Sequence, residues 1–170
     1  GVGQHHVFEL SLDLFGGSAL TSELEVPKHR SAKAIGTGIP VTYVPARNTV
    51  FLSIALAWAE VIPADDIFIG VNARDYSGYP DCRQNTIEAI QLAINLGMES
   101  NINIHTPLMW MTKAETVKLA KDVGALEALA WSHTCYNGKV PPCGECPACT
   151  LRAKGFNEAG INDPLIERTK

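Results

Sequence analysis

The run Ile67-Phe68-Ile69-Gly70-Val71 begins a regular alternation of strand and helix patterns. A short continuous apolar run of this kind is typical of a strand that is buried on both faces. Residues 84–96 carry isoleucines at helical spacing, and Gly97 stands where that helix would stop. Residues 102–104 indicate a second strand, and a capping-box pattern with a closing glycine predicts a helix over 112–124. This order of elements predicts βαβ units and a parallel sheet, so the expected fold class is α/β.

The chain before this alternation has a less regular pattern. Apolar and polar side chains alternate over residues 6–12, which predicts a strand. Residues 13–45 are rich in glycine and proline and indicate a long loop, a kind of connection that is usually functional or mobile. Asn48 is a candidate N-cap for a helix that would run through Ala59.

The composition excludes several classes of protein. The chain has 170 residues, of which 46% are hydrophobic and 19% charged, and its net charge is −4. These values fit a single domain over residues 1–170 and exclude a disordered tail. The acidic balance argues against direct binding of nucleic acid through bulk positive charge. The longest apolar stretch, residues 50–62, is too short to span a membrane, and no secretion signal precedes it, so we expect a cytoplasmic protein.

The predicted sheet also locates a ligand pocket. Ligands of open parallel sheets bind beyond the carboxyl ends of the strands, so segment 72–83 is the expected pocket loop. Its candidate substrate-binding side chains, which suit a planar polar ligand, are Asp75, Tyr76, Tyr79, Asp81 and Arg83. Arg47, beside Asn48, could face an anionic group at the N-terminus of its helix. Two alternatives stay open: a solvated turn built by Gly78 and Pro80, and a plain helix cap at Asn48.

Cysteine spacing gives the strongest chemical signal in the sequence. Four of the five cysteines are clustered, namely Cys135, Cys143, Cys146 and Cys149, whereas Cys82 stands alone. The two-residue spacers allow neighbouring thiolates to point at one ion, and tetrahedral zinc takes four such ligands in closed structural sites. An odd cysteine count without an export signal fits a reducing compartment, where clustered thiols usually hold metal. Unrelated thiols or a disulfide pair are the alternative.

Two other motif interpretations fail on the residues. Pro142-Cys143-Gly144-Glu145-Cys146 matches half of the zinc nucleobase-deaminase signature, but no histidine in the chain has a glutamate two residues later. A fourth cysteine would also fill the coordination position that a deaminase keeps for water. Phe15-Gly16-Gly17-Ser18 lacks the lysine of a phosphate-binding loop, so we expect a turn there.

Taken together, several stretches resemble one enzyme family, the 7-cyano-7-deazaguanine synthases of the queuosine precursor pathway. The matching stretches are Tyr43-Val44-Pro45-Ala46-Arg47-Asn48, Asp75-Tyr76-Ser77-Gly78-Tyr79-Pro80-Asp81-Cys82-Arg83, Thr106-Pro107-Leu108-Met109-Trp110-Met111, and Thr134-Cys135-Tyr136-Asn137-Gly138 with the three cysteines that follow and Leu151-Arg152-Ala153. They occur in the family's order and cover most of the chain, and their combination is far more specific than any one of them.

The resemblance implies a fold similar to that of the ATP pyrophosphatases, a parallel sheet with helices on both faces. It also implies a small zinc site at the four cysteines, in a subregion over residues 133–155. The implied reaction is a ligase reaction, in which 7-carboxy-7-deazaguanine and ammonia are converted to the nitrile with ATP and magnesium. The carboxylate would be adenylated, attacked by ammonia to give an amide, then activated again and dehydrated. Segment 75–83 would lie at the deazaguanine pocket, and a homodimer is plausible for the family.

The chain departs from the family pattern at one point. The family's ATP site begins with Ser-Gly-Gly-x-Asp-Ser after the first strand, and these residues contain no such motif. With the chain also opening on Gly1, we expect a partial domain that lacks the ATP-binding segment and does not catalyse the reaction alone. A zinc-bearing, base-binding module without catalysis is one alternative function. A related tRNA-modifying, adenylating enzyme is the other, although the net charge of −4 speaks mildly against it.

Overall fold

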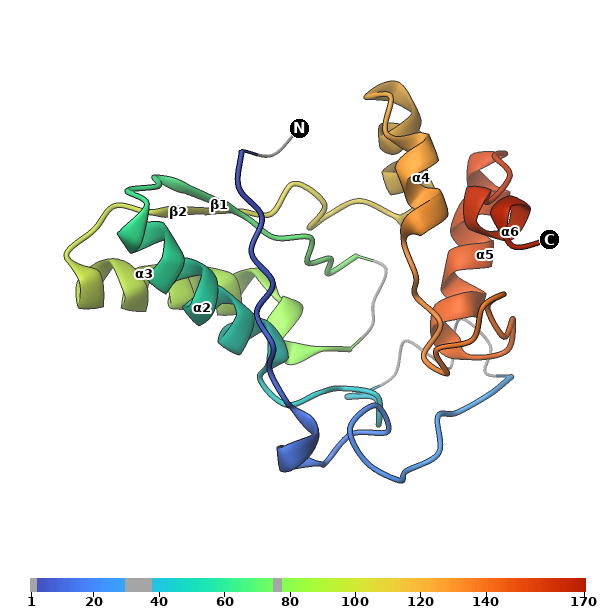
Figure 1. The fold of residues 1–170 in the computed structure, drawn as a ribbon, viewed down its shortest axis with the longest axis horizontal. Coiled ribbons are helices and arrows are strands. Elements are labelled where there is room, and N and C mark those ends of the chain that lie inside the picture. Colours follow the sequence, from blue (N-terminus) through green and yellow to red (C-terminus); the bar gives the residue numbers. More distant parts are fainter. Residues whose placement is uncertain (1–2, 30–37, 75–77) are drawn as a thin grey trace.

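The computed structural model describes residues 3–29, 38–74 and 78–170 (Figure 1). Its described strands, β1 (Asp66–Phe68) and β2 (Asn103–His105), pair in parallel with Ile67 opposite Ile104. Helices α2 (Arg47–Val61) and α3 (Gln84–Met98) pack against this strand pair. The predicted α/β class with a parallel sheet is therefore confirmed.

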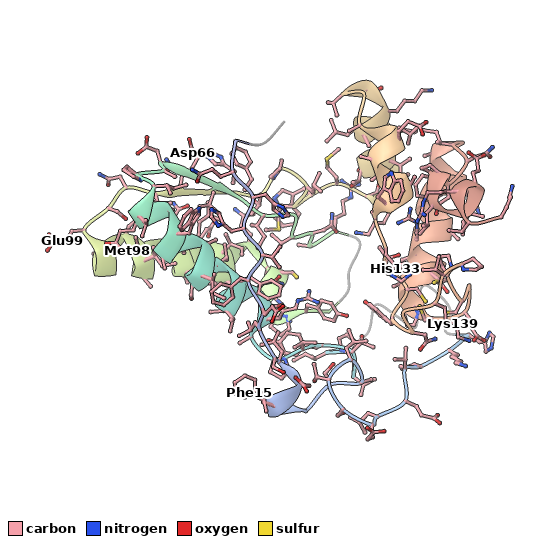
Figure 2. The ribbon with its side chains drawn as sticks, in the orientation of Figure 1. Phe15, Asp66, Met98, Glu99, His133 and Lys139 are labelled. Atoms are coloured by element: carbon pink, nitrogen blue, oxygen red, sulfur yellow. The ribbon has the colours of Figure 1, made fainter. Side chains whose placement is uncertain are left out.

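The strand pair has one buried face and one exposed face. Ile67 and Ile104 turn toward the core formed by α2 and α3, where Leu52, Leu56 and Ile87 are each at most 4% exposed. Phe68 lies on the opposite face, stacked on His105, and stays 71% exposed because no helix in the described ranges covers it. Asp66 lies on the same face as Phe68 and points away from the helices (Figure 2). The prediction of a strand over 67–71 buried on both faces was wrong in extent and in burial.

The helix boundaries differ from the sequence prediction in two places. Asn48 lies inside α2, because the residue at the cap is Ala46 in a left-handed conformation. Gly97 lies inside α3, which ends at Met98; the C-cap residue is Glu99, which is left-handed and donates its N–H to the carbonyl of Asn95. The expected cap at Asn48 and the expected stop at Gly97 were therefore wrong, although both helices were predicted correctly.

A second group of helices lies to the right in Figure 1. It contains α4 (Lys113–Asp122), a 3-10 helix (Leu126–Trp131), α5 (Pro147–Ala159) and α6 (Pro164–Arg168). The predicted capping box of α4 is present: Thr112 accepts the N–H of Glu115, whose side chain accepts the N–H of Thr112. Neither the 3-10 helix nor α6 was predicted.

The N-terminal segment has little regular structure where it is described. Residues 6–12 form no strand and are mostly exposed, so the strand prediction for them was wrong. A 3-10 helix follows at Asp13–Phe15, with Phe15 77% exposed and visible at the lower edge of Figure 2. Gly16 and Gly17 have positive φ, and the turn itself begins at Ser18, whose carbonyl accepts the N–H of Thr21. None of the described helices is long and apolar enough to cross a bilayer.

Candidate metal centre and ligand cavity

The four clustered cysteines converge on one point. The thiols of Cys135, Cys143, Cys146 and Cys149 all lie within 4.8 Å of one another. The first three belong to the metal loop, which we define as residues 134–146, and Cys149 lies in the first turn of α5. Cys146 is fully buried and is the N-cap residue of α5. Four sulfurs this close can bind a metal ion.

The backbone of the metal loop stabilises thiolates at two of the four positions. Burial raises the pKa of the Cys143 thiol, but the backbone N–H groups of Glu145 and Cys146 outweigh it and lower the pKa to about 6. Burial likewise opposes backbone hydrogen bonds at Cys135, and the hydrogen bonds again lower its pKa. At Cys149, burial dominates and raises the pKa. A bound cation would compensate the charge of the deprotonated cluster, because metals take cysteine as thiolate.

The rest of the metal loop supports the cluster by local contacts. The Asn137 side chain donates to the Cys143 sulfur at 3.5 Å, and the Cys143 N–H donates to the Cys135 sulfur at 3.5 Å. Figure 2 shows His133 and Lys139 here, where a ring nitrogen of His133 lies 2.9 Å from the Lys139 carbonyl oxygen. His133 therefore binds backbone and is not part of the ligand set. Among the described residues, these four cysteines are the one group of His, Cys, Asp or Glu side chains whose ligand atoms lie close enough together to bind one metal ion.

A cavity of about 850 Å³ separates the two groups of helices and borders the metal loop. The first residues of α2 and the loop after β1 line one side of it. The metal loop and helices α4 and α5 line the other side, and Cys135 itself is among the lining residues. This position, beyond the carboxyl end of β1, is where the sheet topology predicted a pocket.

Arg47 and Tyr79 bring a cation and an aromatic ring to the same wall of the cavity. The Arg47 guanidinium carbon lies 5.9 Å from the centroid of the Tyr79 ring, and the Tyr43 ring lies 5.8 Å from that ring. Arg47 occupies the first position of α2, so its charge stands where the helix has its positive end. An anionic ligand with a planar ring fits such a wall.

Asp81 does not line the cavity. It is 4% exposed, and its carboxylate accepts the backbone N–H of Asn48 at 2.9 Å, so it satisfies a free donor at the start of α2. The Asn48 side chain in turn donates to the Cys82 sulfur at 3.2 Å. Burial, followed by the Asp81 carboxylate, raises the pKa of Cys82 to about 11 and keeps it a thiol at neutral pH. Asp81 thus holds the helix end that carries Arg47.

The other predicted pocket residues have different placements. Arg83 is exposed, does not line the cavity, and is the residue that precedes α3. Asp75 and Tyr76 lie outside the described residues. The segment 106–111 is held against the loop after β1, because the Asn72 side chain donates to the carbonyls of Leu108 and Met111.

Tyr136 is a cavity residue that sequence reasoning did not select. Its hydroxyl lies 2.9 Å from the hydroxyl of Tyr79, and burial, followed by that hydrogen bond, raises its pKa above the ordinary tyrosine value. The available signal was its position directly after Cys135, which ties it to the metal loop. Nothing local in the sequence indicated its partner, 57 residues earlier.

Sequence comparison matches the chain to one protein family. The family model described as "Queuosine biosynthesis protein QueC" matches residues 1–160. A 7-cyano-7-deazaguanine synthase of Chromobacterium violaceum is 56% identical over 162 residues, which cover 94% of this chain and 68% of that protein. The synthase of Laribacter hongkongensis is 54% identical over 168 residues, covering 99% of this chain and 72% of the relative.

The resemblance inferred from four stretches is therefore confirmed over most of the chain. A third relative, the 7-cyano-7-deazaguanine synthase of Syntrophobacter fumaroxidans, is 51% identical over 172 residues and shares 96% of this chain. The match to residues 1–160 spans the cavity wall and the metal loop. The chain belongs to the QueC family of queuosine biosynthesis proteins.

Proposed function

We propose that this chain forms the base-binding cavity and the metal centre of an ATP-dependent synthase that makes 7-cyano-7-deazaguanine from 7-carboxy-7-deazaguanine and ammonia. The observation that carries the proposal is the cavity wall on which Arg47 and Tyr79 stand beside the four-thiol cluster. A carboxylate attached to a planar heterocycle is the kind of ligand that such a pair recognises. The names of the relatives support this choice of product.

Each residue of the cavity has a distinct role in this proposal. Tyr79 stacks on the heterocycle, and Arg47 pairs with its carboxylate. Asp81 acts indirectly, by holding the N-terminus of α2. Asp75, Tyr76 and Arg83 remain candidate contacts on the strength of their place in segment 75–83, with the carboxylate of Asp75 suited to the ring N–H groups of a guanine-like base.

We further propose Zn²⁺ as the metal of the four thiolates, in the subregion over residues 133–155. The ligand set is all sulfur and fills a tetrahedral site without a position for water, which suits a structural ion.

The reaction itself uses ATP with Mg²⁺. ATP adenylates the carboxylate with release of pyrophosphate, and ammonia displaces AMP to give the amide. A second ATP activates the amide oxygen, and loss of AMP leaves the nitrile. We place these steps in a reducing, cytoplasmic setting, in which the cysteines form no disulfides.

Calorimetry with 7-carboxy-7-deazaguanine tests the cavity assignment. The zinc-loaded chain should bind one equivalent of this base. Arg47→Met should weaken that binding by about tenfold or more, because it removes a charge-assisted contact. The matched ligand is 7-deazaguanine, which lacks the carboxylate and should lose little affinity with the same variant. Absence of binding by the zinc-loaded chain, or an equal loss for both bases, would contradict the assignment.

A second experiment concerns turnover. Conversion of the base by the purified chain with ATP and ¹⁵N-ammonia should be absent, because its residues contain no Ser-Gly-Gly-x-Asp-Ser motif to hold the triphosphate. Fusion to a segment that carries this motif should restore ¹⁵N in the nitrile. Base binding without ATP binding and without restored turnover would instead indicate a base-binding module.

A further inference from the structure

One hydrogen bond joins the metal loop to the opposite wall of the cavity. The hydroxyl of Tyr136, which directly follows the thiol ligand Cys135, lies 2.9 Å from the hydroxyl of Tyr79. Tyr79 comes from the loop after β1 and lines the cavity together with Tyr136. The pair therefore spans two segments that are distant in sequence and that belong to different groups of elements in Figure 1.

The Tyr79 hydroxyl is held on a second side by Thr42. It lies 3.0 Å from the Thr42 hydroxyl oxygen and donates to the Thr42 carbonyl at 3.3 Å. Thr42 is only 3% exposed and is thus enclosed by the fold. The position of the Tyr79 ring consequently depends on one buried partner, Thr42, and on one partner that belongs to the metal loop.

The position of Tyr136 depends in turn on the thiol cluster. Its neighbours Cys135 and Asn137 both contact Cys143, through the Cys143 N–H and the Cys143 sulfur. The conformation of the backbone on both sides of Tyr136 is thus linked to how the four sulfurs gather. In the apo protein, thiolates drawn together without a cation repel one another, whereas a bound cation holds them at fixed positions.

From these contacts we propose that metal occupancy of the thiol cluster positions Tyr79 through Tyr136, so that metal binding and ligand binding in the cavity strengthen each other. Tyr136 is a positioning residue in this scheme, because it acts through Tyr79. The part of the inference that concerns the ligand rests on the proposed base-binding function. Linkage makes the effect reciprocal: a ligand favoured by the metal must favour the metal by the same factor.

Fluorine NMR tests the link without any ligand. The chain has four tyrosines, so labelling with 3-fluorotyrosine gives a spectrum that Tyr→Phe variants assign. Titration with Zn²⁺ should move the Tyr79 resonance of the wild-type chain and leave it in place in Tyr136→Phe. Tyr43→Phe is the matched control, because its hydroxyl instead accepts the N–H of Ala46, and it should retain the Zn²⁺-dependent shift. A Tyr79 resonance that ignores Zn²⁺, or that responds equally in Tyr136→Phe, would overturn the link.

Calorimetry then measures the consequence for the ligand. Removal of Zn²⁺ from the wild-type chain should weaken binding of 7-carboxy-7-deazaguanine by about three- to tenfold, the scale of one neutral hydrogen bond. In Tyr136→Phe and in Tyr79→Phe the metal dependence should disappear, and the double variant should add nothing to either single one. If the zinc-loaded wild-type chain binds no base, the proposed function fails, while the NMR result still decides whether the metal positions Tyr79. Unchanged metal dependence in Tyr136→Phe would overturn the coupling.

Discussion

At the scale of single residues, Asp81 shows how a buried charge can serve a site that it does not touch. Its carboxylate accepts the N–H of Asn48 and thereby replaces the side-chain cap that α2 lacks, since Ala46 stands at the cap position. The first residue of this helix, Arg47, is a cation on one wall of the cavity. The loop after β1 thus contributes Tyr79 to the cavity directly. Through Asp81 it also holds the helix end that presents Arg47.

Substitution of Asp81 should lower both stability and ligand affinity. Asp81→Ala leaves the buried N–H of Asn48 without an acceptor, which costs about 1–3 kcal/mol in the free energy of unfolding. Asp81→Asn keeps an acceptor oxygen and should cost less. Urea denaturation should therefore rank wild type above Asp81→Asn and Asp81→Ala last, and Asp65→Asn, at an exposed position, should change little. Equal stability of Asp81→Ala and wild type would show that the contact has no structural role.

At the scale of elements, α4 and α5 share the most extensive contact among the elements that the structure describes. A Cβ atom added at Gly155 of α5 would lie 2.5 Å from the Cβ atom of Lys113 and 3.2 Å from its backbone carbonyl carbon. The absence of a side chain at Gly155 therefore allows the two helices to approach. This approach sets the wall of the cavity that lies opposite Arg47, because Lys113 and Phe156 both line it.

Gly155→Ala should destabilise the protein, whereas Gly97→Ala should not. Overpacking at Gly155 should reduce the free energy of unfolding by about 1–3 kcal/mol. Gly97 lies near the end of α3 with no atom within 4 Å of an added Cβ, so its replacement should stabilise by about 0.5–1 kcal/mol through helix propensity. Thermal melts of the two variants should shift in opposite directions. A shift in the same direction would mean that the helix spacing at Gly155 is not tight.

The capping box of α4 gives a stability effect that depends on pH. Thr112→Ala should lower the free energy of unfolding by about 1 kcal/mol, as loss of an N-cap usually does.

Hydrogen bonds from the Thr112 backbone and side chain hold the pKa of Glu115 below its ordinary value. The contribution of the Glu115 carboxylate is therefore present above the unfolded pKa of about 4.3, and it is lost as the pH falls through the lower, folded pKa. The free energies of unfolding of wild type and Glu115→Gln should differ at pH 7 and converge in acid. The same difference at every pH would show that the charge of the Glu115 carboxylate is not its cause.

At the scale of the whole molecule, the described elements form two groups that meet around the cavity. Contacts between elements occur within each group, and the two are joined by loops, among them the loop after β1 and segment 106–111. In the second group, Arg152 of α5 pairs with Asp163 and also donates to the carbonyls of Ser132 and Leu129, so it ties α5 to α6 and to the 3-10 helix. The thiol cluster lies beside this framework at the N-terminus of α5.

Metal removal should therefore destabilise the second group of elements. One Zn²⁺ per chain should bind to the wild type and to Cys82→Ser, whose thiol lies outside the cluster, but not to Cys146→Ser. At a hundredfold excess of metal over its Kd, the stabilisation is about 2.7 kcal/mol, which corresponds to a rise in Tm of about 5–10 °C. Atomic absorption and thermal melts with and without chelator check both values. Equal metal content in Cys82→Ser and Cys146→Ser would reject the cluster as the site.

Features encoded by neighbouring residues are predictable from the sequence alone. The helices α2, α3 and α4, the parallel strand pair and the convergence of the four thiols all follow from local spacing. Side chains three or four residues apart in a helix share a face, and a two-residue spacer brings two thiols together, whatever the rest of the chain does.

Features that depend on distant partners were decided by the tertiary structure alone. Residues 6–12 have the alternation of a strand, but a strand forms only when a neighbouring strand accepts its hydrogen bonds, and none of the described residues does so. The cap of α2 comes from Asp81, 33 residues beyond Asn48, and the partner of Tyr136 lies 57 residues before it. Local pattern therefore determined helices α2, α3 and α4, the parallel strand pair and the gathering of the four thiols. The cavity wall and its link to the metal loop were decided only by folding, because their contacts join segments that carry no signal of one another.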